Sequence, residues 1–345
     1  MYESILEFGL EATRWLQATY PQLTPFMQAV SDLGRFEVYL IILPFIYWCL
    51  NKRLGLHLSY VLVISAFLNG LGKHLLRQPR PYWYAPELAR GDTGDFGLPS
   101  GHAQIATTVS FFLAAWFREG WLWVAAVVYT LLMGLSRVYL GVHYVHDVVV
   151  GILLGFVVLG GYVAWQKYAN ERFRHRIFGQ RLLFAALAPV AVYAVYVLIL
   201  WLRGAPEPAN AVREFALAAE SESYEAVLQY FALMFGVGVG FTFEKNRVCF
   251  LATGPFWKRI ARYLLGMVVI LVIWRGGSVL ADLVNPSEAL WLAYPLRFVR
   301  YALLGLWLAY YGPMTFVSLK LADHKIEPEL PYSIEGTVLP TRKEK

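Results

Sequence analysis

Long apolar runs separated by short polar loops dominate this sequence of 345 residues and limit it to few architectures. A membrane-spanning helix needs about 20 mostly apolar residues, and in lipid only helices or closed barrels satisfy every backbone polar group. The sequence therefore predicts an all-α, polytopic membrane helix bundle with about eight or nine transmembrane helices. The runs lie at about 36–50, 54–77, 101–118, 121–139, 146–166, 182–202, 224–243, 260–281 and 289–318.

The composition agrees with a membrane protein. Hydrophobic residues make up 58% of the chain and charged residues only 16%, which is too apolar for an ordinary soluble domain. The net charge is +6, but the basic residues gather in short loops, where anionic lipid explains them better than nucleic acid does. Cys49 and Cys249 lack metal-ligand spacing. We expect membrane lipids as partners, no nucleic acid, no cofactor and no metal, and the sequence specifies no oligomeric state.

The basic loops also predict how the chain threads the membrane. With nine spans, these loops fall on one side, which the positive-inside rule makes cytoplasmic. The other side receives the acidic loops 82–99 and 203–223. The loops that carry Arg80, His102 and His143 would then face the periplasm or a lumen, in a bacterial inner membrane or an ER-type membrane.

Four segments are predicted along the chain. Near the N-terminus Glu residues recur every four positions, which is typical of an interfacial amphipathic helix. In the second half, the alternate glycines from Gly236 to Gly240 predict close packing between helices. The segments are an N-terminal interfacial helix (1–34), a core helix bundle with the motifs described below (35–168), an additional C-terminal transmembrane bundle (169–320) and a polar cytoplasmic tail (321–345).

The motif from Ser136-Arg137 through His143 to Asp147 lies where two apolar runs meet. If His143 opens the second run, Asp147 lies one helical turn further along the same face. A carboxylate placed there can accept the second imidazole N–H, fix the tautomer and support positive charge on the ring. The spacing therefore makes His143 a candidate nucleophile.

Two upstream motifs complete the pattern. Lys73 is followed after six residues by Arg80-Pro81, and Pro99-Ser100-Gly101-His102 precedes the third run. All three motifs, in this order within the 75 residues from Lys73 to Asp147, resemble the type 2 phosphatidic acid phosphatase family. Its relatives include lipid phosphate phosphatases, sphingosine-phosphate phosphatases, glucose-6-phosphatases and vanadium haloperoxidases. The resemblance covers about residues 35–168 and implies an integral membrane phosphatase.

The same residues fit the binding of a phosphate group. A phosphate needs fixed positive charge and donors aimed at its non-bridging oxygens, and Lys73, Arg80 and Arg137 supply the charge. A helix N-terminus presents free N–H groups to an anion. We therefore expect the Ser100 and Gly101 amides and the Ser100 hydroxyl to complete the phosphate cradle.

Three residues have predicted catalytic roles. His143 would attack the phosphorus and form a phosphohistidine, with Asp147 behind its ring. His102, at the start of the third run, would protonate the leaving oxygen and later activate water. No metal is needed in this scheme, because lysine and arginine neutralise the charge.

Polar residues off this pattern receive ordinary interpretations. We expect Asp92 and Asp95 to be solvated loop residues and His74 and His146 to be interfacial histidines, while Arg77 could face a lipid head group. Taken singly, even the motif cations could be snorkelling anchors at the membrane edge. The joint pattern argues for function, because charges at this depth are costly.

The predicted function is hydrolysis of a lipid phosphate or diphosphate, such as a prenyl diphosphate, phosphatidate, phosphatidylglycerol phosphate or a sphingoid phosphate. Three alternatives stay open. A lipid phosphotransferase would pass the phosphoryl group from the same phosphohistidine to a second lipid. A vanadate-dependent haloperoxidase would share the anion cradle, and a lipid transporter or scramblase would carry the motifs as a vestige.

Overall fold

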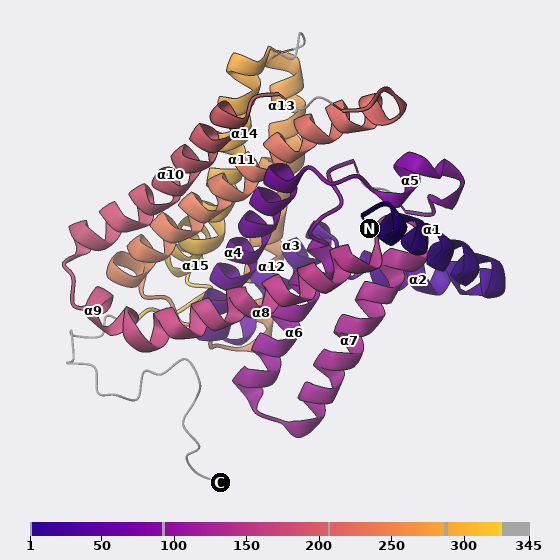
Figure 1. The fold of residues 1–345 in the computed structure, drawn as a ribbon. Helices are drawn as coiled ribbons and strands as arrows, with labels where there is room; N and C mark the ends of the chain where they lie inside the picture. Colours follow the sequence, from indigo (N-terminus) through magenta and orange to yellow (C-terminus); the bar gives the residue numbers. More distant parts are fainter. Residues whose placement is uncertain (1, 92–93, 206–207, 286–288, 326–345) are drawn as a thin grey trace. The chain divides into compact units, whose positions relative to one another are not determined.

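The structure is a computed structural model that describes residues 2–91, 94–205, 208–285 and 289–325 (Figure 1). All regular elements in these ranges are helical, apart from a single bridge between Phe250 and His324. The prediction of an all-α chain is therefore confirmed. Of the predicted polar tail, residues 326–345 lie outside the described residues.

Among the described residues, six helices are long and apolar enough to cross a membrane, and a pair bent by 47°, Pro21–Asp32 with Phe36–Leu50, would add a seventh. The predicted eight or nine spans exceed this number and stay a prediction. Two of the predicted spans that are not among the six lie at α6 (Gly101–Phe117) and at α14 (Leu290–Leu306), which continues in helical turns to Ser318. The 17 residues of α6 are at the lower end of what a bilayer requires. The six are Lys52–Tyr84, Gly120–Tyr139, Val145–Tyr168, Phe178–Arg203, Asn210–Val248 and Phe256–Val284.

The chain divides into two compact units, each built from several segments. The first unit holds all the predicted site residues. The four predicted segments, with boundaries after 34, 168 and 320, remain a prediction. The first unit comprises residues 1–38, 65–162 and 198–227, and the second comprises 39–64, 163–197 and 228–345.

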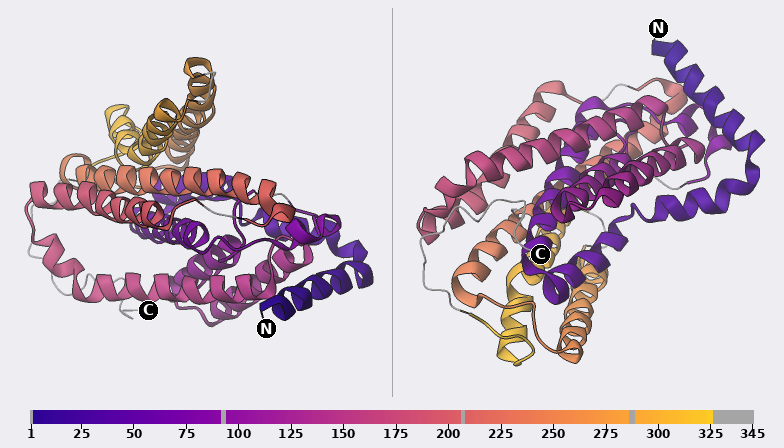
Figure 2. Two further views of the ribbon diagram at one scale, coloured as in Figure 1. Left: turned by 45° about the horizontal axis from the view of Figure 1, so that its top comes forward. Right: turned by 90° about the horizontal axis from the view of Figure 1, so that it is seen from below.

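In the first unit the N-terminal residues form two helices, α1 (Tyr2–Thr19) and α2 (Thr24–Asp32), which follow one another as a V-shaped pair (Figure 2). One face of α1 is buried: the Thr13 hydroxyl donates to the Val138 carbonyl oxygen at 3.1 Å, and Gln17 Nε2 donates to the Tyr139 carbonyl oxygen at 2.8 Å. A helix therefore forms where predicted and is tied to the end of α7 (Gly120–Tyr139). Its interfacial position in a membrane stays a prediction.

Three helices of the first unit carry most of the site: α6, α7 and the first turns of α8 (Val145–Tyr168). Figure 1 shows α6 and α7 as an antiparallel hairpin. Small residues let α8 approach α6, because a Cβ on Gly151 would lie 2.5 Å from the Ser100 carbonyl oxygen and one on Gly155 would lie 2.8 Å from that of Gln104. This close packing places the N-termini of α6 and α8 beside each other.

The second unit has an aromatic core, in which the ring of Tyr47 meets Phe241 and Phe250 with centroids 5.1 and 5.2 Å apart. The predicted close packing at the alternate glycines is confirmed. A Cβ on Gly236 would lie 2.2 Å from the Ala302 carbonyl oxygen, and one on Gly240 would lie 2.7 Å from the Ala309 Cβ.

Candidate active site

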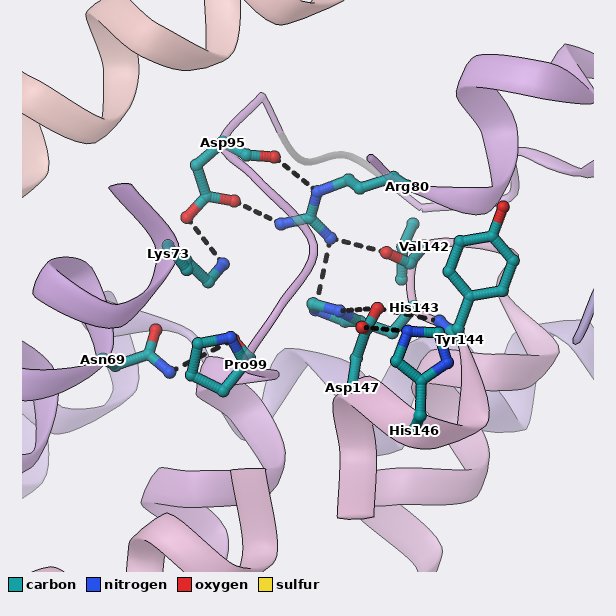
Figure 3. Close-up of polar contacts among 10 residues, drawn as sticks. All are labelled: Asn69, Lys73, Arg80, Asp95, Pro99, Val142, His143, Tyr144, His146 and Asp147. Atoms are coloured by element: carbon teal, nitrogen blue, oxygen red, sulfur yellow. Dashed lines mark hydrogen bonds and ion pairs between the residues drawn. The ribbon is translucent and has the colours of Figure 1, made fainter. Parts of the chain in front are cut away.

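The site residues come from the ends of several elements of the first unit (Figure 3). Lys73 lies in the last turn of α4 (Lys52–Leu76), and Arg80 precedes the short helix α5 (Pro81–Tyr84). Arg137 lies in the last turn of α7, and Asp147 in the first turn of α8. All four side chains are buried. The interior of a helical membrane protein therefore holds a concentrated group of charges.

His143 and Asp147 have the predicted relation. His143 Nδ1 lies 3.3 Å from Asp147 Oδ2, and both side chains are buried. Arg80 Nη1 lies 3.2 Å from Nε2 on the other side of the ring. Because a guanidinium only donates, Nε2 must accept, and we assign the ring proton to Nδ1, where it donates to the carboxylate. The lone pair of Nε2 therefore faces the cationic side of the site.

The same arrangement keeps the His143 imidazole neutral. Burial is the largest influence that lowers the pKa of His143 well below its usual value, and the charges of Arg80, Lys73 and Arg137 lower it further. A neutral imidazole is the form that can act as a nucleophile.

Arg80 is held on three sides. Its Nη1 also donates to the Val142 carbonyl oxygen at 2.6 Å, and its Nε donates to the Asp95 carbonyl oxygen at 2.6 Å. Its Nη2 donates to Asp95 Oδ1. These contacts fix a guanidinium directly beside His143 Nε2.

Asp95 contradicts our interpretation of it as a solvated loop residue. Its Oδ2 lies 2.7 Å from Lys73 Nζ, and its Oδ1 accepts from Arg80, so one carboxylate bridges two motif cations (Figure 3). Burial alone would raise the pKa of Asp95, but the Lys73 ammonium and the Arg80 guanidinium outweigh it and hold that pKa well below its usual range. The carboxylate is therefore ionised. Asp92 lies outside the described residues.

Ser100 is the N-cap residue of α6, but its hydroxyl makes no capping hydrogen bond. Its backbone N–H donates to the Asp147 carbonyl oxygen at 3.0 Å. This corrects part of the predicted cradle, because the Ser100 amide is already occupied. The Ser100 hydroxyl and the N–H of Gly101, which as the first helical residue has no intrahelical acceptor, can still face an anion.

Asn69 is a positioning residue that the sequence analysis missed. Its Nδ2 donates to the Pro99 carbonyl oxygen at 3.2 Å and to Gln104 Oε1 at 2.8 Å, which ties α4 to the start of α6. A Cβ on Gly101 would lie 2.8 Å from Asn69 Oδ1, so the glycine permits this contact. The available signal was the spacing of Asn69, one helical turn before Lys73 on the same face.

Arg137 and Ser100 carry donors with no partner. Arg137 Nη1 donates to the Ser31 hydroxyl, but the Nε and Nη2 atoms of Arg137 and the Ser100 hydroxyl are buried without a hydrogen bond among the described residues. Leaving such a group unsatisfied costs about 1–3 kcal/mol, and more when it is charged. Anionic oxygens are suitable acceptors for these donors.

The other two histidines near the site differ from His143. His146 Nε2 lies 3.3 Å from Asp147 Oδ1 without hydrogen-bond geometry, and its ring stacks on Tyr144 with centroids 5.3 Å apart. His102 begins α6, where a Cβ on Gly34 would lie 2.4 Å from its ring, so the chain between α2 and α3 (Phe36–Phe45) lies against it. The structure therefore puts His143, not His146, between the motif arginine and the carboxylate.

His74, expected as an interfacial histidine, and Arg77, expected as a possible head-group contact, both lie against one carboxylate of the first unit. His74 Nε2 lies 2.9 Å from Glu220 Oε1, and Arg77 Nε donates to Glu220 Oε2 at 2.9 Å. Glu220 belongs to α11 (Arg213–Phe243), whose first turns are part of the first unit. Arg77 therefore holds a protein carboxylate here.

Sequence profiles of known families match two parts of the chain. The profile of the PAP2 superfamily matches residues 54–171, and that of the PAP2 superfamily phosphatase transmembrane extension matches residues 228–324. The chain thus has a PAP2 superfamily domain followed by a PAP2 transmembrane extension. This confirms the resemblance and extends it into the second half, for which the motifs gave no assignment. Together with the long apolar helices it establishes an integral membrane protein.

Several relatives with curated names match part of the chain. Sphingosine-1-phosphate phosphatase 2 of Mus musculus is 32% identical over 145 residues, 39% of this chain and 40% of the relative. Glucose-6-phosphatase catalytic subunit 1 of Bos taurus is 31% identical over 183 residues, 44% of this chain and 51% of the relative. Undecaprenyl-diphosphatase of Sulfolobus acidocaldarius is 30% identical over 136 residues, 39% of this chain and 66% of the relative.

The chain thus spans about 40–66% of the length of these relatives. No solved structure matches it significantly.

Proposed function

We propose that this protein is a membrane phosphatase that hydrolyses a lipid phosphate or diphosphate through a phosphohistidine on His143. The proposal depends on two features of one group of buried residues. Arg137 and Ser100 have buried donors without a partner among the described residues, and the neutral imidazole of His143 has the Asp147 carboxylate at its Nδ1. Such a set fits a phosphate held for attack. The names of the relatives, two phosphatases and a diphosphatase, support the same class of reaction.

In the first step Nε2 of His143 attacks phosphorus in line with the leaving oxygen. The N–P bond forms as the P–O bond to the lipid breaks, and His102 delivers a proton to the departing oxygen. Lys73, Arg80 and Arg137 balance the charge of the non-bridging oxygens. In the second step water attacks phosphorus while His102 takes a proton from that water. The N–P bond breaks, its electron pair returns to Nε2 of His143, and orthophosphate leaves.

Asp147 acts through His143. It holds the Nδ1 proton, so that the lone pair is on Nε2, and it offsets the positive charge that the ring gains when the N–P bond forms. The backbone N–H of Tyr144 donates to the same oxygen at 2.9 Å and fixes its position.

We further propose that the site opens on the periplasmic or lumenal side and that the full chain has eight or nine spans. The number of spans rests on the nine apolar runs of the sequence. The side of the site rests on the positive-inside rule, which keeps the strongly basic loops in the cytoplasm. A bilayer-embedded site suits an amphiphilic substrate that enters between helices. The proposed substrate classes are prenyl diphosphate, phosphatidate, phosphatidylglycerol phosphate and sphingoid phosphate.

A water-soluble sugar phosphate is a second candidate substrate. The specific observation in its favour is that the glucose-6-phosphatase relatives align over a longer part of this chain, 44%, than the sphingosine-1-phosphate phosphatase of Mus musculus at 39%. The buried charges would serve either substrate, because both offer a terminal phosphate group.

The test is phosphate release from a panel of lipid phosphates, a prenyl diphosphate and glucose 6-phosphate, by the purified protein in detergent. His143→Ala should abolish release, and the control His146→Ala should keep most of it. An active His143 variant with a dead His146 variant would overturn the assignment of the nucleophile. Phospholipid product in place of free phosphate would indicate a transferase, halide oxidation with vanadate a haloperoxidase, and lipid movement without hydrolysis a transporter or scramblase.

A further inference from the structure

The contacts of Asp95 resemble those of a bound phosphate. One carboxylate oxygen lies 2.7 Å from Lys73 Nζ and the other accepts from Arg80 Nη2. A phosphate group in the proposed cradle would set two non-bridging oxygens on the same two cations. The protein therefore fills the Lys73 and Arg80 half of the cradle with its own anion.

Among the described residues, Arg137 Nε and Nη2 and the Ser100 hydroxyl are buried without a hydrogen-bond partner. The unpartnered donors of Arg137 and Ser100 show that Asp95 satisfies only part of the positive and donor groups in the site. A carboxylate has two oxygens on one plane, whereas a phosphate has three or more in a tetrahedron. The Asp95 carboxylate therefore occupies part of the proposed phosphate site, while the donors of Arg137 and Ser100 remain for the oxygens of a phosphate.

The backbone beside Asp95 is anchored. The Gly97 N–H donates to the Gln78 carbonyl oxygen at 2.9 Å, and a Cβ on Gly97 would lie 2.7 Å from the Pro79 carbonyl oxygen. Phe96 is buried in a cluster with Trp83 and with Val212, Ala216 and Ala219. The backbone directly after Asp95 is thus held in place.

The side chain itself is less enclosed than its partners. The Asp95 side chain is 27% exposed, compared with 7% for Lys73 and 0% for Arg80. A rotation about its side-chain bonds can therefore take the carboxylate out toward solvent without moving the anchored backbone, while the two cations stay in place.

We propose that Asp95 is an internal competitor for the phosphate site. Its carboxylate occupies Lys73 and Arg80 when no substrate is bound and swings out when a phosphate group enters. This inference rests on the proposed phosphatase function for its substrate, but the competition itself concerns anion binding alone. Because displacement weakens the binding of every phosphate by a common factor, orthophosphate, which has no lipid tail to add affinity, leaves readily after hydrolysis.

A purely structural role makes the opposite prediction. If Asp95 only clamps Lys73 and Arg80 in position, removing its charge lets the cations move apart and weakens anion binding. If it competes, removing the charge strengthens anion binding. The sign of the change in phosphate affinity therefore separates the two roles.

The experiment measures the dissociation constant of orthophosphate by isothermal titration calorimetry on the full-length protein in detergent. Asp95→Asn and Asp95→Ala should each bind orthophosphate at least tenfold more tightly than the wild type. Asp95→Glu, which keeps a carboxylate, should stay within a few-fold of the wild type. The matched control is Glu87→Gln, which removes a carboxylate from the same loop where it is 61% exposed and paired with Arg14, and should leave the affinity unchanged.

Equal or weaker binding by both Asn and Ala variants would overturn the proposal, and so would failure of both to fold, as measured by thermal unfolding. If the wild type hydrolyses phosphate esters but these variants bind orthophosphate no more tightly than the wild type, the proposed competition by Asp95 is wrong and the proposed phosphatase function is retained. If the Asp95 variants bind orthophosphate more tightly than the wild type but the wild type hydrolyses no substrate, the proposed competition by Asp95 is retained and the proposed phosphatase function is wrong. Absence of binding in every form, including Asp95→Ala, contradicts both.

Discussion

Replacing Asp147 by Asn tests the role of a single charge at the centre of the site. The amide oxygen of Asn can take the position of Oδ2 and still accept from Tyr144 N–H and from His143 Nδ1–H, at the present 2.9 and 3.3 Å. The backbone carbonyl oxygen of residue 147 still accepts from Ser100 N–H. The geometry is therefore preserved, and the change isolates the negative charge behind the imidazole.

The expected size of the effect follows from the distance and the burial. Unit charges 3.3 Å apart attract by about 5 kcal/mol at an effective dielectric constant of about 20, which is an upper bound. The net value of a hydrogen bond to a charged group is smaller, about 1.5–3 kcal/mol. Because the ring gains positive charge only as the N–P bond forms, this loss should fall on kcat, which we expect to drop by about ten- to two-hundred-fold.

The assay is the steady-state rate of phosphate release at saturating substrate, compared between Asp147→Asn, the wild type and the control His146→Ala. Thermal unfolding checks that each variant is folded. A kcat for Asp147→Asn within about twofold of the wild type would refute the charge argument. So would an equal loss in the control, since His146 lacks hydrogen-bond geometry to the carboxylate.

Three further predictions concern pH, packing and orientation. Burial and nearby cations lower the pKa of His143, so the ring stays neutral as the pH falls through 6.5. The acid limb of the pH profile of kcat/KM should therefore lie below pH 6.5, and a limb above that value contradicts the assignment. Gly101→Ala should lower both the midpoint of thermal unfolding and kcat, because its Cβ would lie 2.8 Å from Asn69 Oδ1. The control Gly160→Ala should change neither, because a Cβ there meets nothing within 4 Å. Equal effects of the two variants would refute the packing argument. A cysteine placed in the loop 82–99 should react with an impermeant thiol reagent in intact cells and one in 167–181 should not, while reversed labelling would put the site in the cytoplasm.

Much of the site could be predicted because its geometry is local. The four-residue step from His143 to Asp147 fixes their relation as soon as α8 begins, and a Pro-Ser-Gly-His sequence at the start of an apolar run specifies a helix N-terminus. Each of the nine predicted apolar runs likewise coincides with helical segments of the structure. These features depend on neighbours within one or two turns, which a single sequence contains.

The features that were missed depend on the folding of distant segments. Asp95 reaches Lys73 and Arg80 only because the chain after α5 returns across them, and nothing in its local pattern distinguishes it from a solvated carboxylate. The Ser100 amide is taken by the Asp147 carbonyl oxygen because α6 and α8 pack closely at Gly151. Asn69 acts through a contact with Gln104, 35 residues away. The match of residues 228–324 to the transmembrane extension could not be predicted, because no motif of polar residues in that half indicated it.

The most direct test of the account is to trap the phosphoryl group on the enzyme. The protein is mixed with substrate labelled in its phosphate, quenched within one turnover in strong base, where phosphohistidine is stable, and the labelled peptide is identified by mass spectrometry. The account predicts an acid-labile phosphate on His143 that disappears when unlabelled substrate is added before the quench. Turnover without label on His143, or a covalent phosphate on another residue, would contradict it.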